Sequence, residues 1–207
     1  MKKFFLIIIL LIGLKPESID SQSISFGLKG ETDFSNFILV DANGFQSRIK
    51  TGASLGGFLQ MELQEHFALQ GDFLFHYKTS ELNRENQKGD YQYFGNEIAI
   101  YGIGKWRLDK GKIYVGIGPF SEFGFSSTLK RNSEKIDLYK KDEARDIPFM
   151  QDFNSGFGIM LGYEFQCGFQ INAGYKISIT NVLDPNSSSF SMFPNTLSFG
   201  IGYRLGK

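Results

Sequence analysis

The chain has 207 residues with 22 phenylalanines, 24 glycines and one cysteine, and its 22 basic side chains balance 22 acidic ones. A net charge of zero gives no electrostatic reason to expect a nucleic-acid partner, and 42% hydrophobic residues argue against a disordered chain. A single cysteine forms no internal disulfide and no cysteine-based zinc cluster. The mean hydropathy of -0.18, taken alone, is typical of a soluble protein.

The first 21 residues have the organisation of a secretory signal peptide. Lys2 and Lys3 precede an apolar run from Phe4 to Leu14, which is too short for a membrane-spanning helix of about 20 residues. We expect cleavage after Ser21, so that residues 22–207 form the mature domain. A retained membrane anchor is the alternative.

The mature chain alternates apolar and polar side chains in eight runs, and no helical period competes with them. A period of two is typical of β-strands that have one apolar and one polar face. The runs cover residues 24–31, 54–63, 67–78, 97–106, 113–125, 153–165, 169–180 and 197–205.

Two features predict that the polar face is the inside of a barrel. More than thirty large side chains occupy the apolar face, which is more than a narrow eight-stranded interior can hold. Glycines gather on the polar face, where they make room for large polar neighbours. These glycines are Gly27, Gly56, Gly116, Gly118, Gly124, Gly156, Gly158, Gly162, Gly174, Gly200 and Gly202. A soluble lipocalin-like carrier, with its apolar face inside, is the alternative.

The connections between the runs alternate in length. Long loops are expected at 33–50, 79–90, 127–148 and 181–195, and short turns at 64–66, 109–112 and 166–168. Long outer loops that alternate with tight periplasmic turns are typical of outer-membrane barrels. We therefore predict an all-β, eight-stranded, antiparallel up-and-down transmembrane β-barrel with both termini in the periplasm. Aromatic girdles are expected from Tyr77, Tyr101, Trp106, Tyr163, Tyr175 and Tyr203.

Four stretches resemble strands of the PorT-like outer-membrane β-barrel proteins of Bacteroidota-type bacteria. The family motifs are Y-x-E-I-P, G-x-G-P-Y, G-x-x-x-G-Y-E-F and Y-x-x-G-L-x-N-I, and the similar stretches here are residues 91–100, 116–120, 156–165 and 172–182. Two departures are Ala99, where the family has proline, and an end at Lys207 without a terminal phenylalanine. The resemblance implies the barrel fold and, for part of the family, a link with type IX secretion.

Charged side chains on the polar faces predict a salt-bridged plug in the lumen, because an isolated buried charge is costly. Together with His76 they are Lys29, Glu31, Glu62, Asp72, Lys78, Glu97, Lys105, Glu122, Glu164, Lys176 and Arg204. Eight strands leave no channel of porin width.

Catalysis has little support in the sequence. His76 with Asp72 and Glu97, or with Ser80 and Glu81, is the only acid-base candidate, and a lumen hydrogen-bonding role is the simpler interpretation. His66 is expected in a solvated turn, and Cys167 is expected to be a passive thiol. No ligand spacing indicates a metal site, and no cofactor is expected.

A charged loop at 127–148 is the candidate interaction site, with a solvated loop as the alternative. Its basic residues are Lys130, Arg131, Lys135, Lys140, Lys141 and Arg145. We expect a monomeric, non-enzymatic structural or interaction protein in contact with outer-membrane lipids and lipopolysaccharide, accessory to secretion or envelope assembly. A surface adhesion or ligand-binding barrel is the second reading, and an outer-membrane lipid-modifying enzyme the third.

Overall fold

The computed structural model describes residues 23–84, 87–131, 134–140, 148–184 and 189–206, so the expected signal peptide lies outside the described residues. Nine strands occur in this part of the chain. It contains no helix that is long and apolar enough to cross a membrane. The strands are β1 Ile24–Val40, β2 Phe45–Gln64, β3 Phe67–Arg84, β4 Gln87–Leu108, β5 Gly111–Arg131, β6 Glu134–Asp137, β7 Phe153–Phe165, β8 Phe169–Ser178 and β9 Ser191–Arg204.

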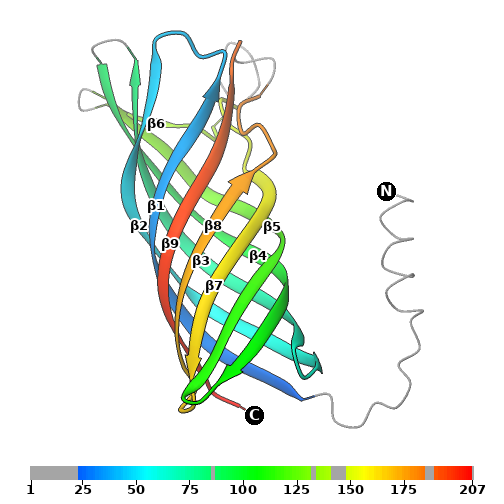
Figure 1. Ribbon diagram of the computed structural model, residues 1–207. Coiled ribbons are helices and arrows are strands. Elements are labelled where there is room, and N and C mark those ends of the chain that lie inside the picture. The colour runs from blue at the N-terminus through cyan, green and yellow to red at the C-terminus, as the bar shows by residue number, and fades with distance from the viewer. Residues whose placement is uncertain (1–22, 85–86, 132–133, 141–147, 185–188, 207) are drawn as a thin grey trace, which may run out of the picture.

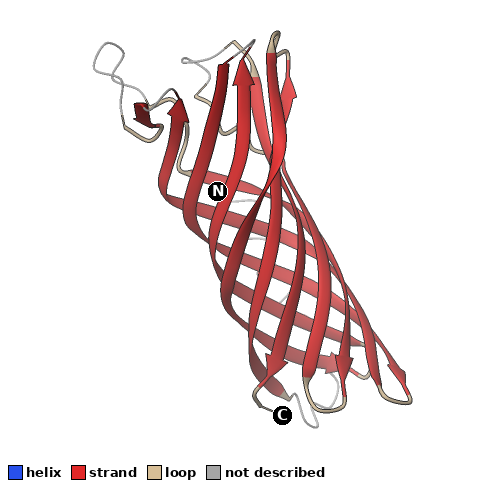
Figure 2. Cartoon of the chain, turned by 90° about the vertical axis from the view of Figure 1, so that its left-hand side faces the viewer, coloured by secondary structure: helices blue, strands red, loops and turns tan. Residues whose placement is uncertain are grey.

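Eight of these strands close into a barrel. Each strand pairs antiparallel with its neighbour in the chain, β5 pairs with β7, and β1 pairs with β9 to complete the circle. The short β6 extends the sheet by pairing only with the end of β5. Figures 1 and 2 show long strands that tilt strongly around the barrel. The predicted eight-stranded up-and-down barrel is confirmed, and β6 is an addition to it.

The two ends of the barrel differ. Gly27 near the start of β1 pairs with Arg204 at the end of β9, so both described termini lie at one end, here named the terminal end. Tight turns at 65–66, 109–110 and 166–168 lie at the same end, as predicted. Gly168 adopts a φ of 87°, which is a left-handed conformation that glycine adopts readily. The opposite end is named the distal end.

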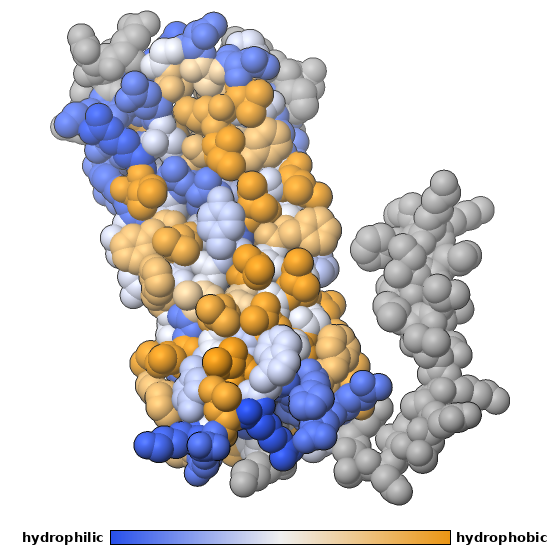
Figure 3. Space-filling model, in the orientation of Figure 1, coloured by the Kyte–Doolittle hydropathy of each residue, from blue (hydrophilic) through white to orange (hydrophobic). Residues whose placement is uncertain are grey.

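The predicted faces of the strands are confirmed. Apolar side chains point outward, with Leu55 at 69% exposed, whereas Glu97 on the polar face is completely buried. Figure 3 shows hydrophobic residues over the middle of the barrel and hydrophilic ones gathered toward both ends. One girdle residue was assigned wrongly: Tyr101 is 1% exposed and lies in the lumen, because it alternates in phase with Glu97. Trp106 does lie on the outer face.

The predicted long loops are largely wrong, because the strands continue past the apolar outer belt. The loop expected at 33–50 is reduced to residues 41–44, and strand residues occupy 79–84 and 87–90 of the loop expected at 79–90. Strand residues also occupy 127–131, 134–137 and 191–195 of the other two loops. The hydrogen-bonded ladder needs no apolar outer face, so polar side chains can point into water on both sides of a hairpin. The residue at which the apolar alternation stops is therefore not the residue at which the strand ends.

An apolar cap closes the distal end on the inside of these extensions. The chain around Leu138 and Met150 meets the chain around Val182 and Met192, and Met150 and Val182 each take part in backbone hydrogen bonds that join these segments. All four side chains are buried, together with Phe37, Leu82, Tyr91, Tyr93 and Leu183. The cap therefore has a core of its own beyond the outer belt.

Candidate functional site: the lumen ion-pair network

All twelve predicted lumen residues point into the barrel. Ten are buried, and Glu62 and Arg204 near the terminal end are partly buried. The β-strand period fixes this arrangement, because every second side chain of each strand faces the interior. They divide into a central network and a terminal layer.

The central network begins with Lys29 on β1. Its ammonium group lies 2.8 Å from a carboxylate oxygen of Asp72 on β3 and 2.9 Å from one of Glu31. Lys176 on β8 donates to both oxygens of Glu97 on β4, at 2.6 and 2.9 Å. These contacts join strands on different sides of the barrel.

His76 lies between two carboxylates in the same network. Its Nδ1 is 3.1 Å from Oδ2 of Asp33, and its Nε2 is 3.4 Å from Oε2 of Glu97. Asp72, the acid partner considered from the sequence, bonds to Lys29 instead. Asp33 was missed because it was assigned to a loop.

Small side chains on β2 bring Asp33 and His76 together across an intervening strand. Gly52 pairs with Asp33, and Ser54 pairs with His76. These two small residues, and Gly56 as the next inward-facing residue, leave space over the inner face of β2. Side chains of β1 and β3 can meet in that space. This run of small inward-facing residues is the sequence signal that could have identified the contact.

The central network continues toward the distal end. The Lys78 ammonium pairs with Glu122, whose other carboxylate oxygen accepts a hydrogen bond from Asn154 at 3.2 Å. Ser178 donates in turn to the side-chain oxygen of Asn154. Side chains of β3, β5, β7 and β8 are thereby joined across the lumen.

The terminal layer lines the opening of the lumen at the terminal end. Arg204 approaches Glu164 at 2.6 Å, Lys112 reaches the same carboxylate at 3.1 Å, and Lys105 pairs with Glu62. Lys112 was not among the predicted residues. These groups line an open polar bowl of about 610 Å³ at the terminal end.

A group of apolar side chains separates the bowl from the central network. Tyr101, Ile103, Tyr114 and Met160 belong to a buried cluster inside the lumen, and Ile103 is completely buried. Sequence reasoning did not anticipate this cluster, because its members occupy positions on the otherwise polar faces. The described barrel is therefore filled by side chains, as expected for eight strands.

The lumen offers no access to a substrate at His76, which is 1% exposed. Ser80 lies four residues further along β3, about 13 Å away at ~3.3 Å per residue. Glu81 accepts a hydrogen bond from Asn83 and lies near Arg48. The structure thus does not assemble His76, Ser80 and Glu81 into one group.

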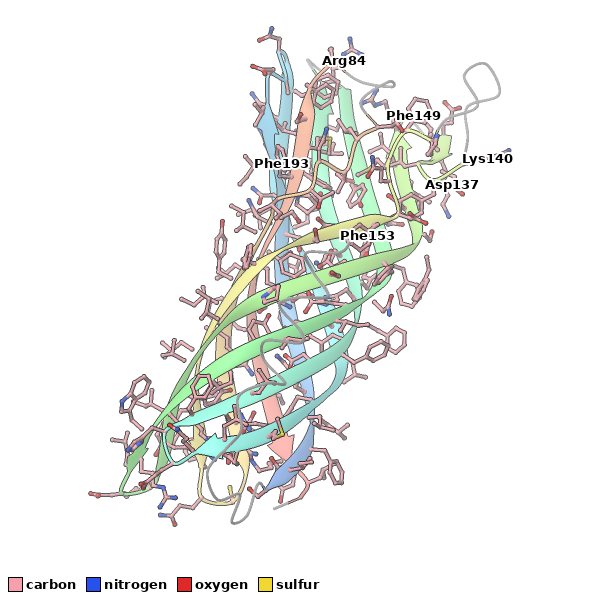
Figure 4. All side chains as sticks on the ribbon, turned by 90° about the vertical axis from the view of Figure 1, so that its right-hand side faces the viewer. Arg84, Asp137, Lys140, Phe149, Phe153 and Phe193 are labelled. Atoms are coloured by element: carbon pink, nitrogen blue, oxygen red, sulfur yellow. The ribbon has the colours of Figure 1, made fainter. Side chains whose placement is uncertain are left out.

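The predicted interaction residues are only partly brought together. Lys130 on β5 pairs directly with Lys135 on β6, and Arg131 pairs with Glu134. Lys140 follows β6, and Figure 4 shows Lys140 and Asp137 at the distal end, to one side of the barrel. Lys141 and Arg145 lie outside the described residues.

Comparison with known proteins gave structural neighbours of low identity. Neisserial surface protein A is 11% identical, with a TM-score of 0.49 over 88% of this chain and 99% of that one. Ail of Yersinia pestis, in complex with the heparin analogue sucrose octasulfate, is 15% identical, with a TM-score of 0.45 over 88% and 99%. The N-terminal β-barrel domain of Pseudomonas aeruginosa OprF is 12% identical, with a TM-score of 0.39 over 86% and 97%.

A search of curated proteins gave no match. The family model for the outer membrane protein beta-barrel domain matches residues 20–184, which is most of the chain and includes β1 to β8. The outward apolar belt and the closed antiparallel barrel agree with that match. The chain belongs to the outer membrane protein beta-barrel domain family.

Proposed function

We propose that this outer-membrane barrel is a non-enzymatic protein that acts by contact with other envelope components through its distal end. The filled lumen carries the proposal: buried ion pairs and an apolar cluster occupy the space through which a channel would conduct. With the lumen filled, the surfaces of the barrel are the parts that remain accessible to large partners.

The distal end supplies the surface that we assign to contact. Strand extensions and β6 project beyond the apolar belt, and Lys130, Lys135 and Lys140 are exposed there. We place the termini and tight turns in the periplasm and the distal end outside the cell, as is usual for outer-membrane barrels. In that orientation the three lysines favour contact with phosphate groups of lipopolysaccharide. We propose a monomer.

An accessory role in protein secretion or envelope assembly is the finer form of the proposal, and it rests on the resemblance to PorT-like barrels. Surface adhesion or ligand binding is the second candidate. A cavity of about 30 Å³ under the cap has room for about one water molecule, and Tyr91, Tyr93 and Ser80 are among its lining residues. The Ser80 hydroxyl is buried without a hydrogen-bond partner among the described residues.

Planar-bilayer recording tests the sealed lumen. We expect the refolded wild-type protein to give no steady conductance of porin size, and such a conductance would contradict the proposal. Heat-modifiable migration on SDS gels verifies that the recorded protein is folded.

A charge-reversal variant tests the distal surface. The triple variant combines Lys130→Glu, Lys135→Glu and Lys140→Glu. Arg107→Glu at the terminal end is the matched control, because Arg107 is also highly exposed. In a deletion strain we expect the control, but not the triple variant, to restore the affected phenotype. Secreted-protein yield reports the secretion role, and binding of whole cells to surfaces reports adhesion. If the triple variant fully restored both secreted-protein yield and whole-cell binding, these lysines would have no role in the function.

A further inference from the structure

We propose that the centre of the lumen is a binding site for one divalent transition-metal ion of the zinc class, with His76, Glu97 and Glu122 as its ligands. The three side chains come from β3, β4 and β5, and all are buried. One ligand atom from each lies within 4.8 Å of the others. Imidazole nitrogen and carboxylate oxygen are ordinary zinc ligands.

Nε2 of His76 is the nitrogen that would bind the proposed ion. Within the described chain, Nε2 of His76 makes no hydrogen bond of good geometry although the side chain is 1% exposed, and its contact with Oε2 of Glu97 is a longer one of 3.4 Å. A buried polar atom without a partner is costly, and an ion is one explanation for it. The 3.4 Å from Nε2 to Oε2 of Glu97 matches the edge of about 3.4 Å in a tetrahedron with metal bonds of ~2.05 Å.

The other nitrogen of His76 is already oriented as in a metal site. Nδ1 lies 3.1 Å from Asp33, a carboxylate that can only accept a hydrogen bond when it is ionised. Metal-binding histidines usually donate their second N–H to a carboxylate or carbonyl, which leaves the first nitrogen as an acceptor for the metal. Asp33 is thus a positioning residue.

The charges of the central network leave room for a cation. Five carboxylates face three ammonium groups, so the network carries two excess negative charges when His76 is neutral. The carboxylates are Glu31, Asp33, Asp72, Glu97 and Glu122, and the ammonium groups are those of Lys29, Lys78 and Lys176. A divalent ion neutralises this excess, which is otherwise costly in a buried site.

Further unpartnered atoms gather around the same place. Oε2 of Glu31, Oδ1 of Asp33 and Oγ of Ser54 are buried without hydrogen-bond partners among the described residues. Ser54 pairs in register with both Glu31 and His76, so these atoms surround one part of the lumen. They can hold water around the ion. Because apolar side chains and the cap close the lumen on either side, we assign the ion a structural role and expect it to enter during folding.

Metal content after refolding tests the site. The full chain is refolded in detergent micelles with Zn²⁺, freed of loose metal on a chelating resin, and analysed for bound zinc. We expect about one ion per barrel in the wild type and at least a tenfold lower content in His76→Gln. His66→Gln is the matched control, because His66 is the other histidine and lies exposed in a turn. Cys167→Ser controls for zinc on the exposed thiol.

Two outcomes would overturn the proposal. One is a wild-type barrel that retains less than about a tenth of an ion per chain. The other is zinc that is kept by His76→Gln and lost from His66→Gln or Cys167→Ser, which would identify an adventitious ion only.

Cobalt provides a second measurement if His76→Gln folds poorly. The wild type refolded with Co²⁺ is expected to show the visible absorption of tetrahedral cobalt, and Glu122→Gln is expected to lose it. Heat-modifiable migration of each variant verifies folding. An unchanged spectrum in folded Glu122→Gln would exclude Glu122 as a ligand.

Discussion

The Asp33 carboxylate on β1 and the His76 ring on β3 meet at 3.1 Å, although β2 lies between their strands. Both side chains are at most 1% exposed. Removal of the acceptor from a buried hydrogen-bonded pair leaves the donor unsatisfied, which costs about 1–3 kcal/mol. We therefore expect Asp33→Ala to lower the free energy of unfolding by roughly that amount in urea titrations of the refolded barrel.

Asp41→Asn is the matched control for Asp33→Ala. Asp41 is exposed in the turn after β1 with a φ of 59°, a conformation that asparagine also adopts readily. We expect this control to stay within ~0.5 kcal/mol of the wild type. An equally small effect of Asp33→Ala would show that the buried contact contributes little to stability.

Gly118 and Gly71 lie on opposite faces of the sheet, so substitutions at these two glycines test which face lines the lumen. A Cβ at Gly118 would collide with the carbonyl oxygen of Ile100, whereas a Cβ at Gly71 would meet no atom within 4 Å. We expect Gly118→Ala to reduce the folded fraction strongly, because the obstacle is backbone that cannot move aside. Gly71→Ala should fold as the wild type does or gain up to ~1 kcal/mol by restricting the unfolded chain.

The folded fraction of both glycine variants is measured by heat-modifiable gel migration and urea unfolding. Equal behaviour of the two would contradict the assignment of Gly118 to the lumen and of Gly71 to the outer face.

The sequence was informative where two environments differ sharply across a strand. Leu55 and Glu97 could be assigned to opposite faces because the outside of the barrel is apolar and the inside polar. Beyond the outer belt both environments are aqueous, so the pattern that identifies a strand disappears while the hydrogen-bonded ladder continues. The pattern therefore predicts a loop at residues 35–40 and 45–50, where the structure has strand.

The partners of the lumen charges could not be predicted for a different reason. Alternation shows that Lys29 and Glu31 share a face, but the partner on another strand depends on register and on the space left by small residues. Asp33 reaches His76 only because Gly52 and Ser54 lie between them. A ligand set drawn from three strands, such as His76, Glu97 and Glu122, likewise has no characteristic spacing in the sequence.

Trp106 reports directly on the membrane setting of the outer face. It is the chain's one tryptophan and is 54% exposed on β4, close to the terminal end. In bilayers we expect blue-shifted emission and strong quenching by lipids brominated on the acyl chains, with little quenching by aqueous iodide. Trp106→Phe should abolish the signal. Emission at the wavelength of a solvated tryptophan, with full quenching by iodide, would contradict a lipid-facing β4.

Tyr139 gives the cap a predicted dependence on alkaline pH. Burial raises the pKa of its hydroxyl, and the nearby Tyr91, Asp152 and Glu122 add to this shift. An unfolded tyrosine ionises near pH 10, so the stabilising contribution of protonated Tyr139 is complete below about that pH. Above it the unfolded chain loses the proton first, and the free energy of unfolding falls by up to ~1.4 kcal/mol per pH unit.

Tyr139→Phe should therefore flatten the decline in the free energy of unfolding between about pH 10 and 12. Tyr175→Phe, on the outer face of β8, controls for the loss of a hydroxyl from an exposed position. Urea unfolding at a series of pH values measures both variants against the wild type. The same slope in Tyr139→Phe and the wild type would mean that this hydroxyl ionises freely in the folded protein and that the cap does not enclose it.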